Sequence, residues 1–195
     1  MVKMLSYKNR KRQGVVLLEL IVSIGLFIIV MFISVGSFLV VLNSHRQALA
    51  TRKGVDSLAF VLEDVVRISR LGSLYHCDSS GTITLPQDCA GGAAYLVLEP
   101  SGGDTADSTD QVIYMLDSSS GKGIVKKSVD GGTIFIPLNS PDVDVQDLKF
   151  YVSGSDELDG NPARILITLK SLVDTGKVQV PIQLQTTVAE RSPDF

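Results

Sequence analysis

The distribution of apolar residues divides the chain into a helical part and a part with strand patterns. From Val15 to Leu42 all residues are uncharged except Glu19, and none is proline. This run of about 28 residues exceeds the roughly 20 that a helix needs to cross a bilayer. It therefore predicts a membrane-spanning helix.

The helix is expected to continue beyond the apolar run as an amphipathic spine, because no turn signal follows Leu42. Apolar residues recur there at the i, i+3, i+4, i+7 spacing of a one-sided helix. The expected buried stripe consists of Leu49, Val55, Leu58, Leu62, Val65 and Ser69, flanked by Ala59 and Val66.

The first stop signal for this helix is Gly72, which is followed by a serine. Arg67 and Arg70 fall in the preceding turn, where cations favour the helix dipole. We therefore predict one helix from about residue 15 to 71. Glu63 stands four residues before Arg67, in the favourable order for a helix-surface ion pair.

After Gly72 the pattern changes to short apolar or alternating runs separated by Gly, Ser, Asp and Pro clusters, as is typical of strands and turns. The turns are too short to hold crossover helices, so we expect antiparallel strands. The predicted fold is α+β, with a long N-terminal helix packed on an antiparallel β-sheet head. The segment 174–176 predicts a hairpin turn, and the acidic stretch 101–110 predicts a mobile surface loop. The predicted strands are Ala94–Leu98, Gln111–Leu116, Gly123–Val129, Thr133–Pro137, Val143–Ser153, Ala163–Leu172 and Lys177–Val188.

Charge is distributed unevenly along the 195 residues. The formal net charge is −3, yet five Lys or Arg residues precede Val15, and Asp is frequent after Gly102. By the positive-inside rule, we expect a cytoplasmic N-terminus and an extracytoplasmic body in a single-pass protein of the cytoplasmic (inner) membrane. The apolar run is too long for a secretory signal core, so it should be retained. The body has no basic face and no Trp, which argues against nucleic-acid binding.

Cys77 and Cys89 are the only cysteines. In an extracytoplasmic domain, two cysteines separated by a short loop favour a disulfide over free thiols. On the chain-entropy model such a bridge stabilises the fold by about 3 kcal/mol. Zinc is a weak alternative, because His76 is adjacent to Cys77 and no second pair of metal ligands follows.

The chain has no evident catalytic constellation, so we do not expect an enzyme. No Ser, Cys or Thr occupies a sharp strand-to-helix elbow, and adjacent His76 and Cys77 would point apart in an extended strand. No cofactor is predicted. Calcium is a minor alternative at two acidic clusters, neither of which matches the spaced calcium-loop pattern. The clusters are Asp142, Asp144 and Asp147, and Asp156, Glu157 and Asp159.

The junction between the basic leader and the apolar run reads Lys11-Arg12-Gln13-Gly14-Val15-Val16-Leu17-Leu18-Glu19-Leu20. A basic leader ending in Gly, an apolar helix with Glu at its fifth position, an amphipathic spine and a β-rich head together resemble the type IV pilin-like superfamily. The resemblance implies cleavage after Gly14 by a prepilin peptidase and N-methylation of the new terminus at Val15. It also implies that Glu19 acts in subunit assembly.

Electrostatics gives the spacing between Val15 and Glu19 a rationale. A carboxylate in hydrocarbon costs roughly 2.5–3.5 kcal/mol on insertion scales, so a lone intramembrane Glu indicates function. Cleavage would leave a positive amine at Val15, and Glu19 could neutralise the amine of an adjacent subunit. Desolvation offsets much of this attraction, so the pair is expected to set register more than affinity. The alternative is a signal-anchor protein in which Glu19 reaches interfacial water.

Two departures from the family pattern bear on the subclass. The first mature residue would be Val15 where the family mostly has Phe or Met. The helix also lacks the proline that abundant filament subunits often carry, and Gly36 is the only nearby substitute. With the size of the head, this favours a minor pilin or a larger minor pseudopilin. The segments 56–70, 110–114, 145–150 and 185–191 have a diffuse likeness to such subunits.

These observations predict a leader over 1–14, a transmembrane and assembly helix over 15–44, and a head over 45–195 with an amphipathic helix (45–72) and a β-rich region (73–195). The expected function is to initiate or cap assembly of a type IV pilus, or of a type II secretion or competence pseudopilus. Implied partners are the prepilin peptidase, other pilins or pseudopilins, the inner-membrane assembly platform and, before assembly, membrane lipid.

Two other functions stay open at this point. One is a tip adhesin or DNA-binding pilin, which would use an exposed aromatic or basic patch. The other is an unprocessed single-pass envelope protein. The residues available for the patch are few: Tyr75, Lys122, Lys126 and Lys127.

Overall fold

The computed structural model describes residues 10–156, 161–176 and 178–191, with side chains from residue 15 onward. Its contacts divide the chain into two units, Met1–Gln47 and Ala48–Phe195. One helix, α1, spans Arg10–Ser69 and contributes to both units. It begins before the predicted residue 15 because Arg, Lys and Gln are good helix formers and extend it backward.

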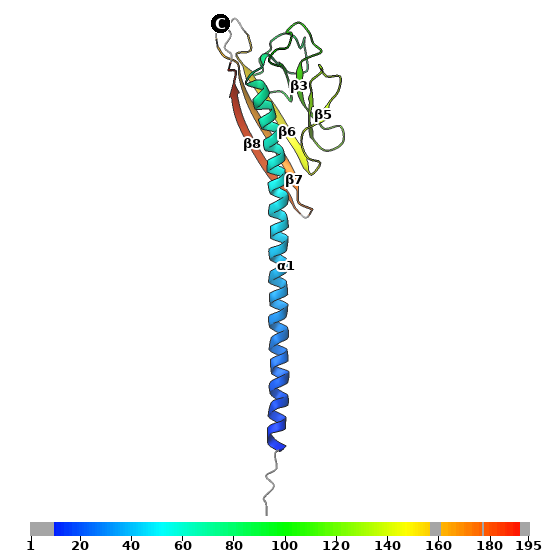
Figure 1. Ribbon diagram of the computed structural model, residues 1–195, viewed down its shortest axis with the longest axis vertical. Helices are drawn as coiled ribbons and strands as arrows, with labels where there is room; N and C mark the ends of the chain where they lie inside the picture. Colours follow the sequence, from blue (N-terminus) through cyan, green and yellow to red (C-terminus); the bar gives the residue numbers. More distant parts are fainter. Residues whose placement is uncertain (1–9, 157–160, 177, 192–195) are drawn as a thin grey trace, which may run out of the picture. The chain divides into compact units, whose positions relative to one another are not determined.

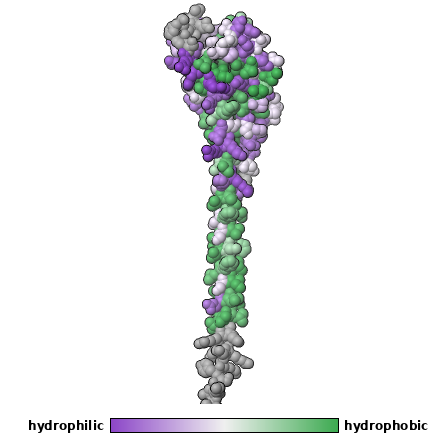
Figure 2. Space-filling model, viewed as in Figure 1, coloured by the Kyte–Doolittle hydropathy of each residue, from purple (hydrophilic) through white to green (hydrophobic). Residues whose placement is uncertain are grey.

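The described part of the N-terminal unit is a helical segment with exposed side chains all round. Every side chain from Val15 to Val41 is exposed, and Phe32 retains 76% of its accessible surface. Figure 2 shows that apolar residues, in green, make up most of the visible face of this segment. The Ser34 hydroxyl donates to the Val30 carbonyl oxygen at 2.8 Å, which satisfies it within the helix. The described chain thus contains one helix long and apolar enough to cross a membrane.

The C-terminal unit combines residues 48–69 of α1 with antiparallel strands in two sheets (Figure 1). This confirms the α+β fold, an arrangement consistent with a pilin-like fold, and it corrects the single predicted sheet to two. The first sheet has the order β1-β2-β3-β4-β5 and the second β6-β7-β8. The strands are β1 Ser73–Cys77, β2 Tyr95–Glu99, β3 Val112–Asp117, β4 Ile124–Ser128, β5 Ile136–Pro137, β6 Val143–Ser153, β7 Arg164–Asp174 and β8 Gln179–Ala189.

The strand β1 was not predicted, and its geometry explains why. Its pairing with β2 is interrupted by a register shift between Ser73 and His76, and Leu74 has a positive φ of 52°. Four consecutive residues of β1 are buried, so the chain shows no alternation of apolar and polar positions there. At the other end of this sheet, the predicted strand Thr133–Pro137 shortens to the two residues of β5.

The core of the C-terminal unit lies between the end of α1 and both sheets. Leu58, Val61 and Val65 of α1 are buried against strand residues of the two sheets. Gly54 is buried as well, and a Cβ at this position would collide with the Val173 side chain of β7. The glycine therefore allows α1 to approach β7 closely.

The buried face of α1 differs in part from the predicted stripe. Leu58, Val65 and Ser69 are buried as expected. Leu49 and Val55 are exposed, because the face turned toward the sheets runs through Gly54, Leu58, Val61 and Val65.

The end of α1 is fixed by an aromatic hydroxyl. The Tyr75 hydroxyl of β1 lies 2.6 Å from the Ser69 carbonyl oxygen and 2.7 Å from that of Gly72. Ser69 is the last residue of α1, so its carbonyl group has no partner within the helix and meets the Tyr75 hydroxyl instead. A Cβ on Gly72 would come within 2.7 Å of the Glu99 carbonyl oxygen, so the tight passage from α1 into β1 requires glycine.

The two sheets are linked through the free edge of β6. Ala93 and Phe150 form an isolated antiparallel bridge, with N–O distances of 3.0 and 2.8 Å. On the other side of the second sheet, β7 and β8 pair in continuous antiparallel register. The turn between them is closed by the Asp174 carboxylate, which accepts from the Gly176 N–H at 2.7 Å. This confirms the predicted hairpin.

Candidate functional site

The junction that carries the predicted processing site lies inside α1. Gly14 and Val15 both belong to the helix, and Glu19 follows one turn after Val15. Residues four apart share one face of a helix, so the Val15 and Glu19 side chains lie on the same side. Hydrolysis of the Gly14–Val15 bond would require this turn to unwind into an extended conformation, to which glycine offers little resistance.

Glu19 is the single charged residue of the apolar segment from Val15 to Leu42. Its side chain is exposed, as are the apolar side chains around it. Within the described part of the chain, the Glu19 carboxylate has no hydrogen bond or ion pair. A carboxylate in this setting is satisfied only by groups from outside the described chain: water, lipid headgroups or another protein.

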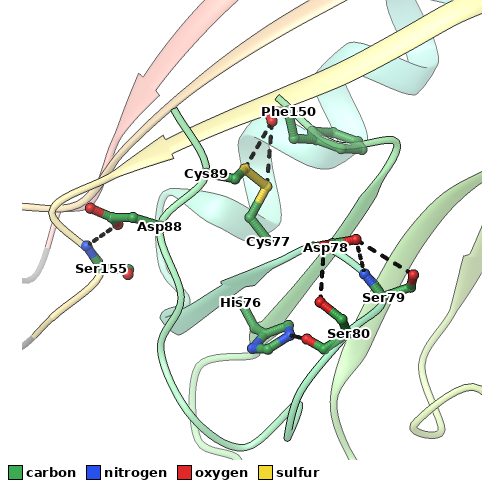
Figure 3. Close-up of a disulfide and its surroundings, with 9 residues drawn as sticks. All are labelled: His76, Cys77, Asp78, Ser79, Ser80, Asp88, Cys89, Phe150 and Ser155. Carbon is green, nitrogen blue, oxygen red and sulfur yellow. Dashed lines mark hydrogen bonds between the residues drawn. A yellow bond between two sulfur atoms is a disulfide. The ribbon is translucent and has the colours of Figure 1, made fainter. Parts of the chain in front are cut away.

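The predicted disulfide between Cys77 and Cys89 is present, with its Cα atoms 5.7 Å apart. Figure 3 shows both sulfur atoms directed at the Phe150 carbonyl oxygen of β6, at 3.4 and 3.2 Å. Next to the bridge, the Asp88 carboxylate accepts hydrogen bonds from the Gly154 and Ser155 N–H groups at 3.1 and 2.9 Å. The disulfide loop is therefore tied to the end of β6.

His76 has a structural position beside this bridge. Its Nδ1 lies 2.8 Å from the Leu85 carbonyl oxygen and its Nε2 lies 2.9 Å from that of Ser80, so either tautomer donates to a carbonyl group of the disulfide loop. Because Cys77 is in a disulfide, it is not a thiolate that His76 could activate.

The acidic clusters considered for calcium do not assemble as metal centres in the described residues. The Asp144 carboxylate accepts from the Gly123 N–H at 2.7 Å and from the Gln146 side chain. Asp156 is described, whereas Glu157 and Asp159 lie outside the described residues. Among the described side chains, no three His, Cys, Asp or Glu residues converge in a ready-made metal site.

A buried charge network connects α1 to the first sheet, and sequence reasoning missed it. The Asp64 carboxylate, 7% exposed, accepts from the Tyr114 hydroxyl at 2.7 Å, from Lys127 Nζ at 2.7 Å and from Arg67 at 2.8 Å. Arg67 thus pairs with Asp64, not with Glu63 as predicted. The signal was present in the sequence, because Asp64 falls between Val61 and Val65 on the apolar face of the helix.

The contacts around Asp64 shift the pKa values of two side chains, Asp64 and Tyr114. Burial alone raises the pKa of the Asp64 carboxyl, but hydrogen bonds from Lys127, Tyr114 and Arg67 outweigh burial and hold that pKa below its usual range. The pKa of the Tyr114 hydroxyl is raised, by burial first and then by Asp64. Lys127 Nζ also lies 5.6 Å from the centre of the Tyr114 ring, within reach of a cation–π contact.

The residues considered for an adhesive or DNA-binding patch are engaged inside the C-terminal unit. Tyr75 is 1% exposed. Lys126 pairs with Asp117, and Lys127 pairs with Asp64. Lys122 Nζ donates to the Pro141 carbonyl oxygen at 3.3 Å. These four residues do not form a free basic and aromatic patch.

Comparison with protein-family models, with curated proteins and with solved structures finds no significant match. The case for a function therefore rests on the residues of this chain. They bring together an apolar helix exposed all round, a single carboxylate near its start, and a disulfide-bonded head built on the same helix.

Proposed function

We propose that this chain is a minor subunit of a type IV pilus or of a related pseudopilus, processed by a prepilin peptidase and active in initiating or capping filament assembly. The observation that carries the proposal is Glu19, a lone carboxylate one turn after a candidate cleavage point in a helix that is apolar on all sides. Such a charge is costly in lipid and requires a partner.

The proposed partner is an amine that processing creates. Hydrolysis of the Gly14–Val15 bond leaves a carboxylate on Gly14 and an α-amine on Val15. An α-amine has a pKa of about 7.7–8.0, so it is largely protonated at neutral pH. In a bundle of parallel helices, Glu19 of one subunit would neutralise the Val15 amine of a neighbour, and methylation of this amine would keep its charge.

The exposed apolar segment supports the same proposal. Side chains from Val15 to Val41 are exposed around the whole helix, so apolar surface is available for contacts in every direction and not on one face only. A helix of this kind is stable in lipid and also when surrounded by similar helices. The proposed sequence of events uses both environments: lipid before assembly, and neighbouring subunits in the filament.

In this proposal the basic leader keeps the N-terminus in the cytoplasm, and the head is extracytoplasmic, where its disulfide persists. The assembly platform in the inner membrane would extract the processed subunit from lipid. The head of this minor subunit would then contact other minor subunits, and these contacts would prime or cap a filament made mostly of other pilins or pseudopilins.

The experiment that tests processing is mass analysis of the N-terminus after co-expression with a prepilin peptidase. We expect a mature chain that begins at Val15 and carries one methyl group on its amine. The matched control is Gly14→Val, which should accumulate as the unprocessed chain, because a β-branched residue hinders access to the bond. A wild-type chain that still begins at Met1 would contradict the proposal and favour an unprocessed single-pass envelope protein.

A further inference from the structure

Glu99, the last residue of β2, is a buried acidic side chain without a partner. It is 1% exposed, and neither of its carboxylate oxygens accepts a hydrogen bond from the described residues. Gln111 directly precedes β3 and is fully buried, and its amide oxygen and nitrogen are also unpaired. Buried polar groups are nearly always satisfied in native proteins, so two such side chains without partners point to a polar ligand.

The sheet register brings these two side chains together. Leu98 of β2 pairs with Val112 of β3, so Glu99 and Gln111 occupy the next position at the end of the ladder. The loop that joins the strands folds back over them. A Cβ on Gly103 would collide with Glu99 Oε1 and lie 3.1 Å from Asp110 Oδ2, so both carboxylates approach the same point beside this glycine.

Asp110 contributes a further unpaired oxygen. Its Oδ2 accepts from the Asp104 N–H at 2.9 Å, whereas its Oδ1 is buried without a partner. The other two acidic residues of the loop are used locally, since Asp104 accepts from the Ala106 N–H and Asp107 from the Thr109 N–H. Asp104 and Asp107 add negative charge near Glu99 and Asp110, but neither has a buried oxygen without a partner.

No cation balances this charge among the described residues. No Lys, Arg or His of the described residues forms an ion pair with Glu99 or Asp110. Burial raises the pKa of the Glu99 carboxyl, and the neighbouring Asp110, Asp104 and Asp107 raise it further. The nearby Gln111 side chain lowers the pKa of Glu99 in part, but no atom of either side chain has a hydrogen-bond partner within the described residues.

We propose that the base of the β2–β3 loop binds a calcium ion through the carboxylates of Glu99 and Asp110 and the amide oxygen of Gln111. All of these ligands are oxygen atoms, as hard cations prefer, and calcium commonly completes its shell of six to eight oxygens with backbone carbonyls and water. Two carboxylates and one amide suffice for such a site, although no three acidic side chains converge there. Magnesium usually keeps several of its waters. It fits less well here, because Glu99 and Gln111 are buried and shielded from solvent.

The geometry of this site concerns the head alone; only the supply of calcium to it rests on the extracytoplasmic location in the proposed function. The site gives the acidic loop 101–110 a role: the loop closes over the ion. Extracellular calcium modules bind with dissociation constants of roughly 0.1–1 mM, so the site would be filled outside the cytoplasm and would stabilise the head there.

The test uses the full-length chain in detergent micelles, stripped of metal with a chelator and titrated with calcium chloride or magnesium chloride. Binding is followed by calorimetry, and head unfolding by near-ultraviolet circular dichroism. At a hundredfold excess over the dissociation constant, we expect calcium to raise the melting temperature by about 5 °C or more. Magnesium should raise it by much less. An equal effect of both ions would overturn the assignment to calcium, and no effect of either would overturn the site.

Glu99→Gln provides a sharper outcome than loss of binding alone. This substitution preserves shape and removes a buried charge, so the metal-free variant should melt at a higher temperature than the metal-free wild type. It should also lose at least tenfold in calcium affinity. Asp142→Asn, in an exposed acidic turn, is the control and should bind calcium as the wild type does. Wild-type calcium binding in a folded Glu99→Gln variant would place the ion elsewhere and contradict the proposal.

Discussion

Two carboxylates on the same helix are satisfied in opposite ways. Glu19, near the start of α1, stands among exposed apolar side chains and has no partner in the described chain. Asp64, near the end of α1, is 7% exposed and accepts from Lys127 and Tyr114 of the first sheet and from Arg67. The helix therefore carries one charge that the fold neutralises internally and one that it leaves for another molecule.

This difference separates stability from assembly. A buried carboxylate with three donors contributes to the folded state, because its removal leaves the donors unsatisfied. A carboxylate without an internal partner contributes nothing to folding, and in lipid it has a cost. We therefore expect substitutions of Asp64 to act on the head, and substitutions of Glu19 to act on association.

The largest effect on stability should follow from Asp64→Ala. Removing this carboxylate leaves Lys127, which is 11% exposed, and the buried Tyr114 hydroxyl without their shared partner. We expect the free energy of unfolding to fall by about 3–5 kcal/mol, as is usual when one member of a buried pair is removed. Urea titration of the full-length chain in micelles, followed by near-ultraviolet circular dichroism, measures this change.

Asp56→Ala is the matched control, since Asp56 is exposed on the same helix. It should change stability by less than about 0.5 kcal/mol. Similar losses of unfolding free energy in both variants would show that the Asp64 network does not stabilise the head, and would contradict the distinction drawn between Asp64 and Glu19.

A smaller effect should appear in the pH dependence of stability. The folded pKa of Asp64 is lowered from the ordinary value of 3.8, so the unfolded chain takes up its proton first as the pH falls. The contribution of Asp64 is then fully present above that value and is lost as the pH falls toward the folded pKa.

Comparison with Asp64→Asn isolates this contribution from those of other carboxylates with lowered pKa, such as Asp117 and Asp130. The difference in unfolding free energy between wild type and Asp64→Asn should be constant near neutral pH and should shrink below about pH 4. A difference that stays constant down to the acid transition would contradict the lowered pKa.

The contrast between these carboxylates also marks how far the sequence alone leads. Glu19 could be singled out because its surroundings are uniform, so a single charge in the apolar run is visible without any tertiary structure. The length of α1, the long strands β6 to β8, and the Cys77–Cys89 bridge were predictable for a related reason: each is specified by local periodicity or by the only available pairing.

Features that depend on tertiary contacts were predicted poorly. The Asp64 network joins residues 50 and 63 positions apart, and no local pattern reports such pairs. The buried face of α1 was displaced because Gly54, with no apolar side chain, packs against Val173. Glu99 was overlooked for a similar reason, because its burial follows from the register of β2 on β3 and from the return of the loop at Gly103.

Whether Glu19 pairs with a neighbouring subunit is decided by the incorporation of Glu19→Ala into filaments, in a host that carries the complete assembly system. Glu63→Ala, exposed on the same helix, is the control. We expect Glu19→Ala to be inserted, cut to begin at Val15 and stable in its head, yet absent from purified filaments, whereas Glu63→Ala is incorporated normally. Wild-type incorporation of Glu19→Ala would contradict the claim that Glu19 finds its partner in a neighbouring subunit.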